Sequence, residues 1–201
     1  HYYGIYISGG TPAITSNEIT DTSGYGIYVV GGTPTIQNNT LMDNTRHLQH
    51  TPSVQPSYSG NTFSGAGGNG IEITSGSVTG DVTWVNVQDM NWPYVINGDV
   101  DIVSGATLHL PAGTVVKFRA NYVDLLVHGT LDVQGTAANR VVFTSYKDDA
   151  NGGDTNGDGA ASTPASRDWQ SIIFYNGTNT FDYTLVQYGG SSYDHTYGVI
   201  Y

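Results

Sequence analysis

Hydrophobic and polar positions in the first third of the chain recur with a constant spacing. Gly-Ile-Tyr-Ile at residues 4–7 returns as Gly-Ile-Tyr-Val at residues 26–29, a shift of 26 − 4 = 22. Gly-Gly-Thr-Pro at residues 9–12 returns at residues 31–34 with the same shift. Repetition at such a period is typical of a solenoid, and it takes precedence over any local assignment.

Each period contains three short extended segments, centred in the first copy on Ile5, Ile14 and Ile19 and separated by Gly-Gly, Thr-Pro and Asn-containing corners. None of these segments can bury its apolar side alone. Stacking successive coils about 4.8 Å apart places Ile5 on Ile27 and gives a continuous core. The pattern predicts an all-β fold, a single-stranded right-handed parallel β-helix of about nine coils, from a length of 201 and a period of 22.

The period loosens in the rest of the chain, although alternating strands continue. Leu-His-Leu at residues 108–110 and Leu-Asp-Val at residues 131–133 are examples, and no window has helical spacing with caps. We expect one β-helix segment over residues 1–201. It has regular repeats over 1–75 and looser coils over 76–201, with an acidic, Gly-rich insertion at 147–167.

Two segments depart from the repeat. Residues 48–58 lack the Gly-Ile pattern, so we expect this part of the third coil to bulge out as a loop. Residues 195–201 resemble residues 1–7. The chain is then one unit of a longer tandem array, or its coil ends stack head to tail between molecules; alternatively, two glycine-containing strands are simply alike.

Asparagine recurs at one corner of the coil, at Asn17, Asn39 and Asn61. Their amides can hydrogen-bond along the axis and to the corner backbone. We expect a structural ladder here and no binding site.

Composition excludes several classes of function. The net charge is −11, the six Lys and Arg residues form no cluster, and there is no cysteine. An acidic surface repels phosphate backbones, so nucleic acid is not an expected partner. No apolar run approaches the length that crosses a bilayer, so membrane insertion is not expected, and residues 1–7 already read as a strand, so we expect a piece of a longer protein.

The second half carries a family resemblance. Residues 103–118, Val-Ser-Gly-Ala-Thr-Leu-His-Leu-Pro-Ala-Gly-Thr-Val-Val-Lys-Phe, and residues 129–136, Gly-Thr-Leu-Asp-Val-Gln-Gly-Thr, resemble coils of large bacterial right-handed parallel β-helix surface proteins. Asp168 and Trp169 restart the coils as members of that group do. The resemblance implies the pectate-lyase-like superfold and, of its types, the non-catalytic adhesin or stalk. It says little about function, because this architecture also carries lyases and hydrolases.

The insertion contains a calcium-loop pattern. Asp154, Asn156 and Asp158 occupy positions 1, 3 and 5 of the D-x-N-x-D-G motif, and a glycine follows at position 6. Position 12 is an alanine in place of the usual glutamate, so Asp149 or Asp168 is expected to supply the missing carboxylate. The sequence therefore predicts a structural Ca²⁺ site at Asp149, Asp154, Asn156, Asp158 and Asp168, with a solvated acidic turn as the alternative.

An enzyme remains the alternative function. Asp148 and Asp149 resemble the paired aspartates of inverting hydrolases that share this fold, and Arg167 beside Asp168 could act as a lyase base. The rest of the hydrolase motif set is missing, since only His128-Gly129 stands where Gly-His-Gly is needed. We assign no catalytic residues.

Tyrosines lie on or beside the strands of the repeating half, at Tyr2, Tyr3, Tyr6, Tyr25 and Tyr28. Those that alternate with isoleucine point outward, where stacked rings can hold sugars or simply pack on one another. We expect an extracellular or cell-surface structural or adhesive shaft that associates with itself head to tail or with adjacent repeats. A carbohydrate-active or carbohydrate-binding β-helix is the alternative, and surface carbohydrate is the second expected partner.

Overall fold

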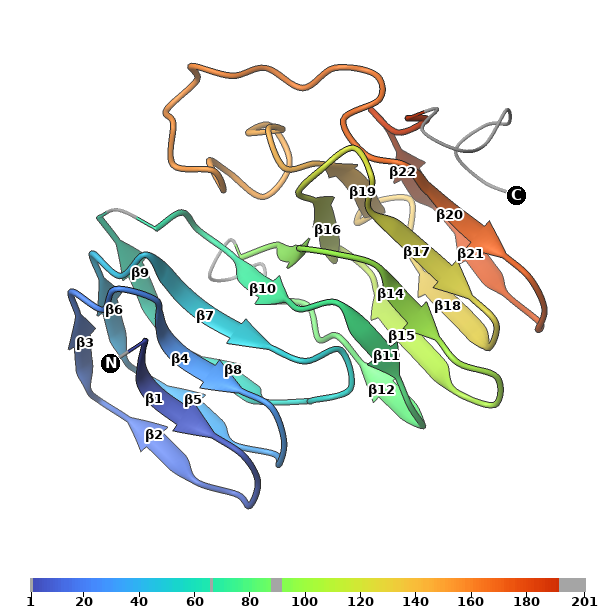
Figure 1. Ribbon diagram of the computed structural model, residues 1–201. Coiled ribbons are helices and arrows are strands. Elements are labelled where there is room, and N and C mark those ends of the chain that lie inside the picture. The colour runs from blue at the N-terminus through green and yellow to red at the C-terminus, as the bar shows by residue number, and fades with distance from the viewer. Residues whose placement is uncertain (1, 66, 88–91, 192–201) are drawn as a thin grey trace.

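The computed structural model describes residues 2–65, 67–87 and 92–191, and these form β-strands joined by turns, with no helix among them. The chain winds as a parallel β-solenoid (Figure 1). One sheet runs through its whole length, and we call it the main sheet. Its strands pair in parallel, in the order β1 (Tyr3–Ile7), β4 (Tyr25–Val29), β7 (Arg46–His50), β10 (Ile71–Ile73), β13 (Tyr94–Ile96), β16 (Val115–Phe118), β19 (Val141–Ser145) and β22 (Thr184–Val186).

The other faces of the coil are each divided into an upstream and a downstream sheet. Upstream lie two three-stranded sheets, β2 (Ala13–Thr15), β5 (Thr35–Gln37), β8 (Ser57–Ser59) and β3 (Glu18–Thr20), β6 (Thr40–Met42), β9 (Thr62–Ser64). Downstream lie two four-stranded sheets, β11 (Gly76–Val78), β14 (Val100–Ile102), β17 (Asp124–Val127), β20 (Ser171–Phe174) and β12 (Asp81–Thr83), β15 (Thr107–Pro111), β18 (Thr130–Gln134), β21 (Thr180–Asp182).

The predicted stacking of the aliphatic rows is confirmed. Ile5 pairs with Ile27, which pairs with Leu48, and Ile19 pairs with Leu41. Ile27, Leu48 and Leu41 are fully buried. At roughly 25 cal/mol per Å² of apolar surface, each such side chain contributes about 1.5–3 kcal/mol, and only the stack removes it from water. The 22-residue period is therefore the length of chain needed to return one inward side chain onto the previous one.

The predicted asparagine ladder is also confirmed. The Asn39 side chain accepts hydrogen bonds from the backbone and side-chain nitrogens of Asn17, both at 2.9 Å. Its own Nδ2 donates to the Ile14 carbonyl at 2.8 Å and to Asn61 Oδ1 at 3.0 Å. Asn39 and Asn61 are buried. The ladder thus satisfies corner groups that would otherwise be buried without partners.

Upstream and downstream sheets meet at a seam between β8 and β12. Here side chains replace backbone pairing: Ser53 Oγ donates to the Ser77 carbonyl at 2.9 Å. The Gln55 amide donates to the Asp81 carbonyl at 3.1 Å and accepts from the Thr83 N–H at 2.9 Å. The amide of Gln55 therefore takes the place of a neighbouring strand for β12.

Two expectations are corrected. The third coil does not bulge over residues 48–58, because Leu48 lies in β7 and Tyr58 in β8, and both strands pair with the preceding coil. The estimate of nine coils is too high for the described residues, which stack eight strands in the main sheet. The insertion between β19 and β20 uses residues without adding a coil. Residues 195–201, expected to match the start of the chain, lie outside the described residues.

Replacement of Asn39 by alanine is expected to lower the free energy of unfolding by about 2–3 kcal/mol. The substitution removes the side-chain donor to the Ile14 carbonyl, one of the two hydrogen bonds that Asn61 Oδ1 accepts, and the acceptor of the Asn17 backbone N–H. A buried unsatisfied group costs about 1–3 kcal/mol. Urea unfolding measures the loss. Asn17→Ala, at the exposed end of the ladder, is the matched control and should cost less; equal costs for the two variants would argue against the ladder as a buried network.

Acid is expected to destabilise the solenoid through two buried histidines. Burial lowers the pKa of His47 and of His50 to about 4, from 6.5. Between these values the unfolded chain binds protons that the folded chain does not, so the free energy of unfolding falls as the pH drops from 6.5 toward 4. The slope is about 1.4 kcal/mol per pH unit for each histidine. Urea unfolding at several pH values should show a shallower slope for His50→Gln than for His128→Gln, whose histidine is partly exposed. Identical slopes would contradict this origin.

Candidate metal centre on the outer face of the main sheet

A buried lysine anchors the acidic insertion to the main sheet. Lys117 points outward from β16, yet its side chain is fully buried. Its Nζ donates three hydrogen bonds, to the carbonyls of Asp148 and Gly153, both at 2.8 Å, and to Thr155 Oγ1 at 2.6 Å. Burial lowers the pKa of Lys117 to about 8, although the nearby aspartates oppose the shift. All three ammonium donors are thus used to fix the insertion.

Asp148 has a structural position at the base of the insertion. Its Oδ2 accepts hydrogen bonds from Thr144 Oγ1 at 2.6 Å, and from Asn151 Nδ2 and Gln187 Nε2, both at 2.8 Å. Its Oδ1 accepts the backbone N–H of Ala150 at 3.1 Å. Because both oxygens are engaged and the residue is buried, Asp148 holds the turn of the insertion against β19.

The insertion leaves β19 and returns to β20, and it is drawn in orange in Figure 1. It reaches back over coils laid down much earlier in the sequence. Asn69 Nδ2 donates to the Asp154 carbonyl at 3.5 Å. A Cβ added to Gly68 would lie 2.0 Å from the Thr155 carbonyl, so only glycine permits this approach. The insertion therefore contacts the chain just before β10 as well as β16 and β19.

The outward row of the main sheet is buried over these coils. Register pairs Glu72 with Val95 and Val95 with Lys117, on the side opposite the core row. All three side chains are nonetheless buried. Glu72 also forms ion pairs with Arg46, at 2.7 Å, and with Arg119. This part of the outer face is closed by side chains and by the insertion.

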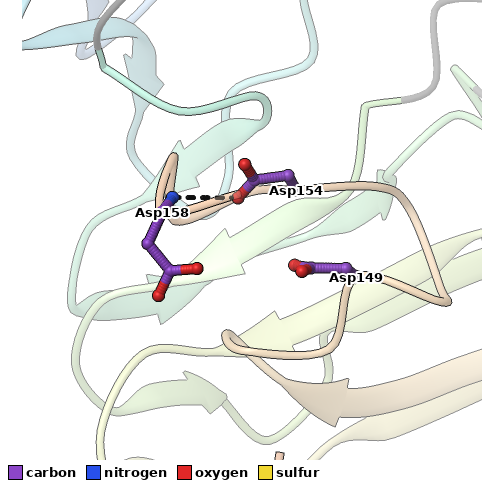
Figure 2. Close-up of side chains that lie close together, drawn as sticks. All are labelled: Asp149, Asp154 and Asp158. Carbon is purple, nitrogen blue, oxygen red and sulfur yellow. Dashed lines mark hydrogen bonds between the residues drawn. The ribbon is translucent and has the colours of Figure 1, made fainter. Parts of the chain in front are cut away.

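Three of the predicted metal ligands come together on the insertion. Carboxylate oxygens of Asp149, Asp154 and Asp158 all lie within 4.8 Å of one another, and Figure 2 shows them facing a common space. Asp154 Oδ1 accepts the backbone N–H of Gly157 at 2.8 Å, and Oδ2 accepts that of Gly159 at 2.8 Å. These bonds form the tight turn that brings Asp158 beside Asp154.

Asp149 distinguishes the cluster from an ordinary acidic turn. Its Oδ1 is buried and has no hydrogen-bond partner among the described residues. Burial, followed by the charge of Asp154, raises its pKa. A buried carboxylate oxygen without a donor is costly, and close carboxylates repel one another unless a cation neutralises them. This donor set fits Ca²⁺, which prefers oxygen ligands.

The remaining predicted ligands are oriented differently. Asn156 donates its amide to Asp158 Oδ2 at 3.0 Å and to Ser162 Oγ at 2.8 Å, so it braces the loop beside the cluster. Asp168 is not a member of the carboxylate cluster among the described residues. It pairs with Lys147 Nζ at 2.8 Å and accepts from Ser145 Oγ at 2.7 Å. Burial raises the pKa of Asp168, but these hydrogen bonds outweigh it and the net shift is downward.

A second charged group, on the β12–β15–β18 sheet, was missed from the sequence. His109 Nδ1 lies 2.7 Å from Asp132 and its Nε2 lies 2.7 Å from Asp81. Burial lowers the pKa of His109, but the hydrogen bonds to Asp132 and then Asp81 outweigh it and raise the pKa overall. His109 and Asp132 are register partners on neighbouring strands. Aligning the coils of the sequence would therefore have placed the two side chains together, whereas a search for metal-ligand spacing along the chain does not.

Comparison with protein families agrees with this architecture. The family described as "Right handed beta helix region" matches residues 1–89. The family described as "Pectate-lyase like beta helix domain" matches residues 76–201, more than half of the chain. The chain belongs to the pectate-lyase-like β-helix domain family. No curated protein and no solved structure matches it.

The right-handed parallel coil that the sequence resemblance predicted is thus confirmed for this pectate-lyase-like β-helix. Family membership does not by itself assign a function. Among the described residues, no helix is long and apolar enough to span a bilayer.

Replacement of Lys117 by methionine is expected to release the insertion while leaving the β-helix folded. Methionine keeps most of the volume but removes all three hydrogen bonds from Nζ; of their acceptors, the Gly153 carbonyl keeps a donor in Thr155 Oγ1. Limited proteolysis within residues 148–162 should accelerate about tenfold or more, equivalent to about 1.4 kcal/mol of local stability.

The matched control is Lys147→Met, because the Lys147 side chain is 44% exposed and its ion pair with Asp168 contributes less. Equal cleavage rates for wild type and Lys117→Met would contradict the anchoring role.

Proposed function

We propose that this chain is an extracellular structural shaft whose acidic insertion binds Ca²⁺ and is clamped over the outer face of the main sheet. The single observation that carries the proposal is the Asp149, Asp154 and Asp158 cluster, with its unpartnered buried oxygen on Asp149. A bound cation would neutralise the three carboxylates at the outer end of the insertion, where it would hold the loop as the Lys117 ammonium holds the inner end. The result is one rigid body built from coil and insertion.

Support for a structural role also comes from the groups considered for catalysis. Asp148 accepts four hydrogen bonds, and Asp168 is engaged by Lys147 and Ser145. A general acid or base must reach a proton on a bound substrate, and both carboxylates are occupied in holding the insertion. A shaft, by contrast, needs this rigidity. The asparagine ladder and the stacked aliphatic rows join successive coils along the axis of the shaft, and head-to-tail or tandem association would extend the shaft.

Calcium is expected to raise the thermal stability of the protein. At a calcium concentration 100 times Kd, binding to the folded state alone contributes about 2.7 kcal/mol. For a chain of this size that corresponds to a rise in Tm on the order of 5–10 °C. Thermal unfolding with calcium and with a chelator measures the shift, and Mg²⁺ at the same concentration should give a smaller one, because it requires a tighter octahedral shell.

Asp158→Asn should abolish most of the calcium-dependent rise in Tm. Asp182→Asn removes the same charge from β21, outside the cluster, and should leave the rise intact. A rise retained in the first variant, or absent in wild type, would reject the calcium site. Electron microscopy of the same samples then tests association: fibres would support the filament, and dispersed particles would leave only the tandem shaft.

A tyrosine cluster on the first two coils favours carbohydrate binding as the second candidate function. Tyr6 and Tyr28 contact each other edge to face across the coils, with ring centroids 5.7 Å apart, and the Tyr3 ring centroid lies 5.1 Å from that of Tyr28. Tyr2 and Tyr6 are 61% and 54% exposed. Flat exposed rings of this kind can pack on the apolar faces of sugars.

Tyr6→Ala is expected to weaken any retention of the protein in polysaccharide gels by at least about threefold, roughly 0.6 kcal/mol, a modest share of one aromatic contact. Tyr122→Ala removes a ring of comparable exposure, 61% against 54% for Tyr6, elsewhere on the surface and is the control. Retention that is absent from the wild type, or the same in both variants, would count against sugar binding at this cluster.

A further inference from the structure

A groove lies at the seam, where the upstream sheet β2–β5–β8 stops in the middle of the solenoid. Among the described strands β8 has one neighbour, β5, whereas the main sheet continues past this level. The groove has a volume of about 670 Å³. It is lined by β8 and the two residues before it, and by the end of β12 and the segment after it, namely Gln55, Pro56, Ser57, Tyr58, Thr83, Val85, Asn86 and Val87.

Backbone groups of β8 face this groove because of the parallel register. The hydrogen bonds from Ser57 N–H to the Pro34 carbonyl and from Asn38 N–H to the Ser59 carbonyl, both 2.9 Å, direct Ser57 and Ser59 toward β5. In a strand the backbone N–H and carbonyl of one residue point toward one neighbouring strand, and those of the next residue point toward the opposite edge. The N–H and carbonyl of Tyr58 therefore point away from β5, toward the groove, while its ring packs on the core.

The repeat shows which groups the next strand would use. The Pro12 carbonyl accepts from Thr35 N–H, and the Pro34 carbonyl accepts from Ser57 N–H, each at 2.9 Å. Pro56 is the next proline in this series, 22 residues after Pro34, and it lines the groove. Directly after the strand, Ser16 and Asn38 each donate the backbone N–H to a carbonyl of the following coil. Gly60 is the next residue in that series.

We propose that this groove binds an extended strand of a partner polypeptide, which adds in parallel to β8 and carries a Thr-Pro-x-Ile sequence like that of β2 and β5. The residue after its proline donates to the Pro56 carbonyl, and its strand end accepts from Gly60. Its isoleucine stacks on Tyr58, as Ile36 does from the other side. Strand addition of this kind takes its affinity from main-chain hydrogen bonds. The inference goes beyond the shaft function and does not depend on calcium.

The probe is the heptapeptide Thr-Pro-Ala-Ile-Thr-Ser-Asn, the sequence of residues 11–17. Titrated into the full chain and followed by amide NMR, it should saturate and shift the Tyr58 and Gly60 amides. A control peptide with an N-methyl group on the alanine lacks the N–H that meets Pro56. It should bind at least about tenfold more weakly, a loss of about 1.4 kcal/mol.

The matched protein variants are Val85→Trp and Tyr122→Trp. Val85 is 39% exposed and lines the groove, so an indole there fills it without disturbing the core, while Tyr122 is exposed and does not line it. With folding of both verified by thermal unfolding, Val85→Trp should lose at least about tenfold in peptide affinity and Tyr122→Trp should lose none.

Several results would overturn the proposal. These are no saturable shift of Tyr58 and Gly60 at millimolar peptide, equal binding of the N-methylated peptide, or equal binding by Val85→Trp. Shifts of the same amides by a neutral oligosaccharide such as maltohexaose, without shifts by the peptide, would assign the groove to sugar instead.

Discussion

Each coil of this protein must place its inward side chains on those of the coil before it, and the rest of the structure depends on that constraint. Ile27 is buried only because Ile5 and Leu48 lie on either side of it along the axis. The backbone pairs follow from the same stacking, and so does the asparagine ladder. Stability is therefore distributed along the axis, with each coil relying on its neighbours.

The stacking of inward side chains does not restrict the residues on the outer face, and the insertion packs against that face. An ammonium group without hydrogen bonds would be very costly at the position of Lys117. Three oxygens from the insertion satisfy it, so the lysine and the insertion are stable only together. The acidic cluster beyond them brings three carboxylates together, and we propose that a calcium ion neutralises them.

At the seam, the coils stay stacked in the main sheet, but strand pairing is interrupted on the other faces of the solenoid. The main sheet keeps its pairing past residue 70, while β8 and β12 are joined by the Gln55 amide. A strand edge with groups aimed at open space is ordinarily a liability. Here it lies in a bounded groove, which restricts what can pair with it.

Much of the coil could be predicted from the sequence, because inward positions tolerate only apolar residues and so preserve the period. Ile14, Ile19 and the asparagine corner stand where that period puts them. The covered outer face could not be predicted, since Lys117 alternates with Val116 and reads as an ordinary exposed strand residue. Asp168 is close to the acidic loop in sequence, but the chain turns it toward Lys147. The coil count failed because an insertion lengthens the chain without adding a strand.

Hydrogen exchange across the whole chain, with calcium and with a chelator, tests the calcium-clamped shaft most directly. Slower exchange confined to the insertion, residues 149–162, with the main-sheet strands protected in both conditions, is the predicted result. Unchanged exchange in the insertion, or calcium-dependent changes spread over the strands, would contradict it.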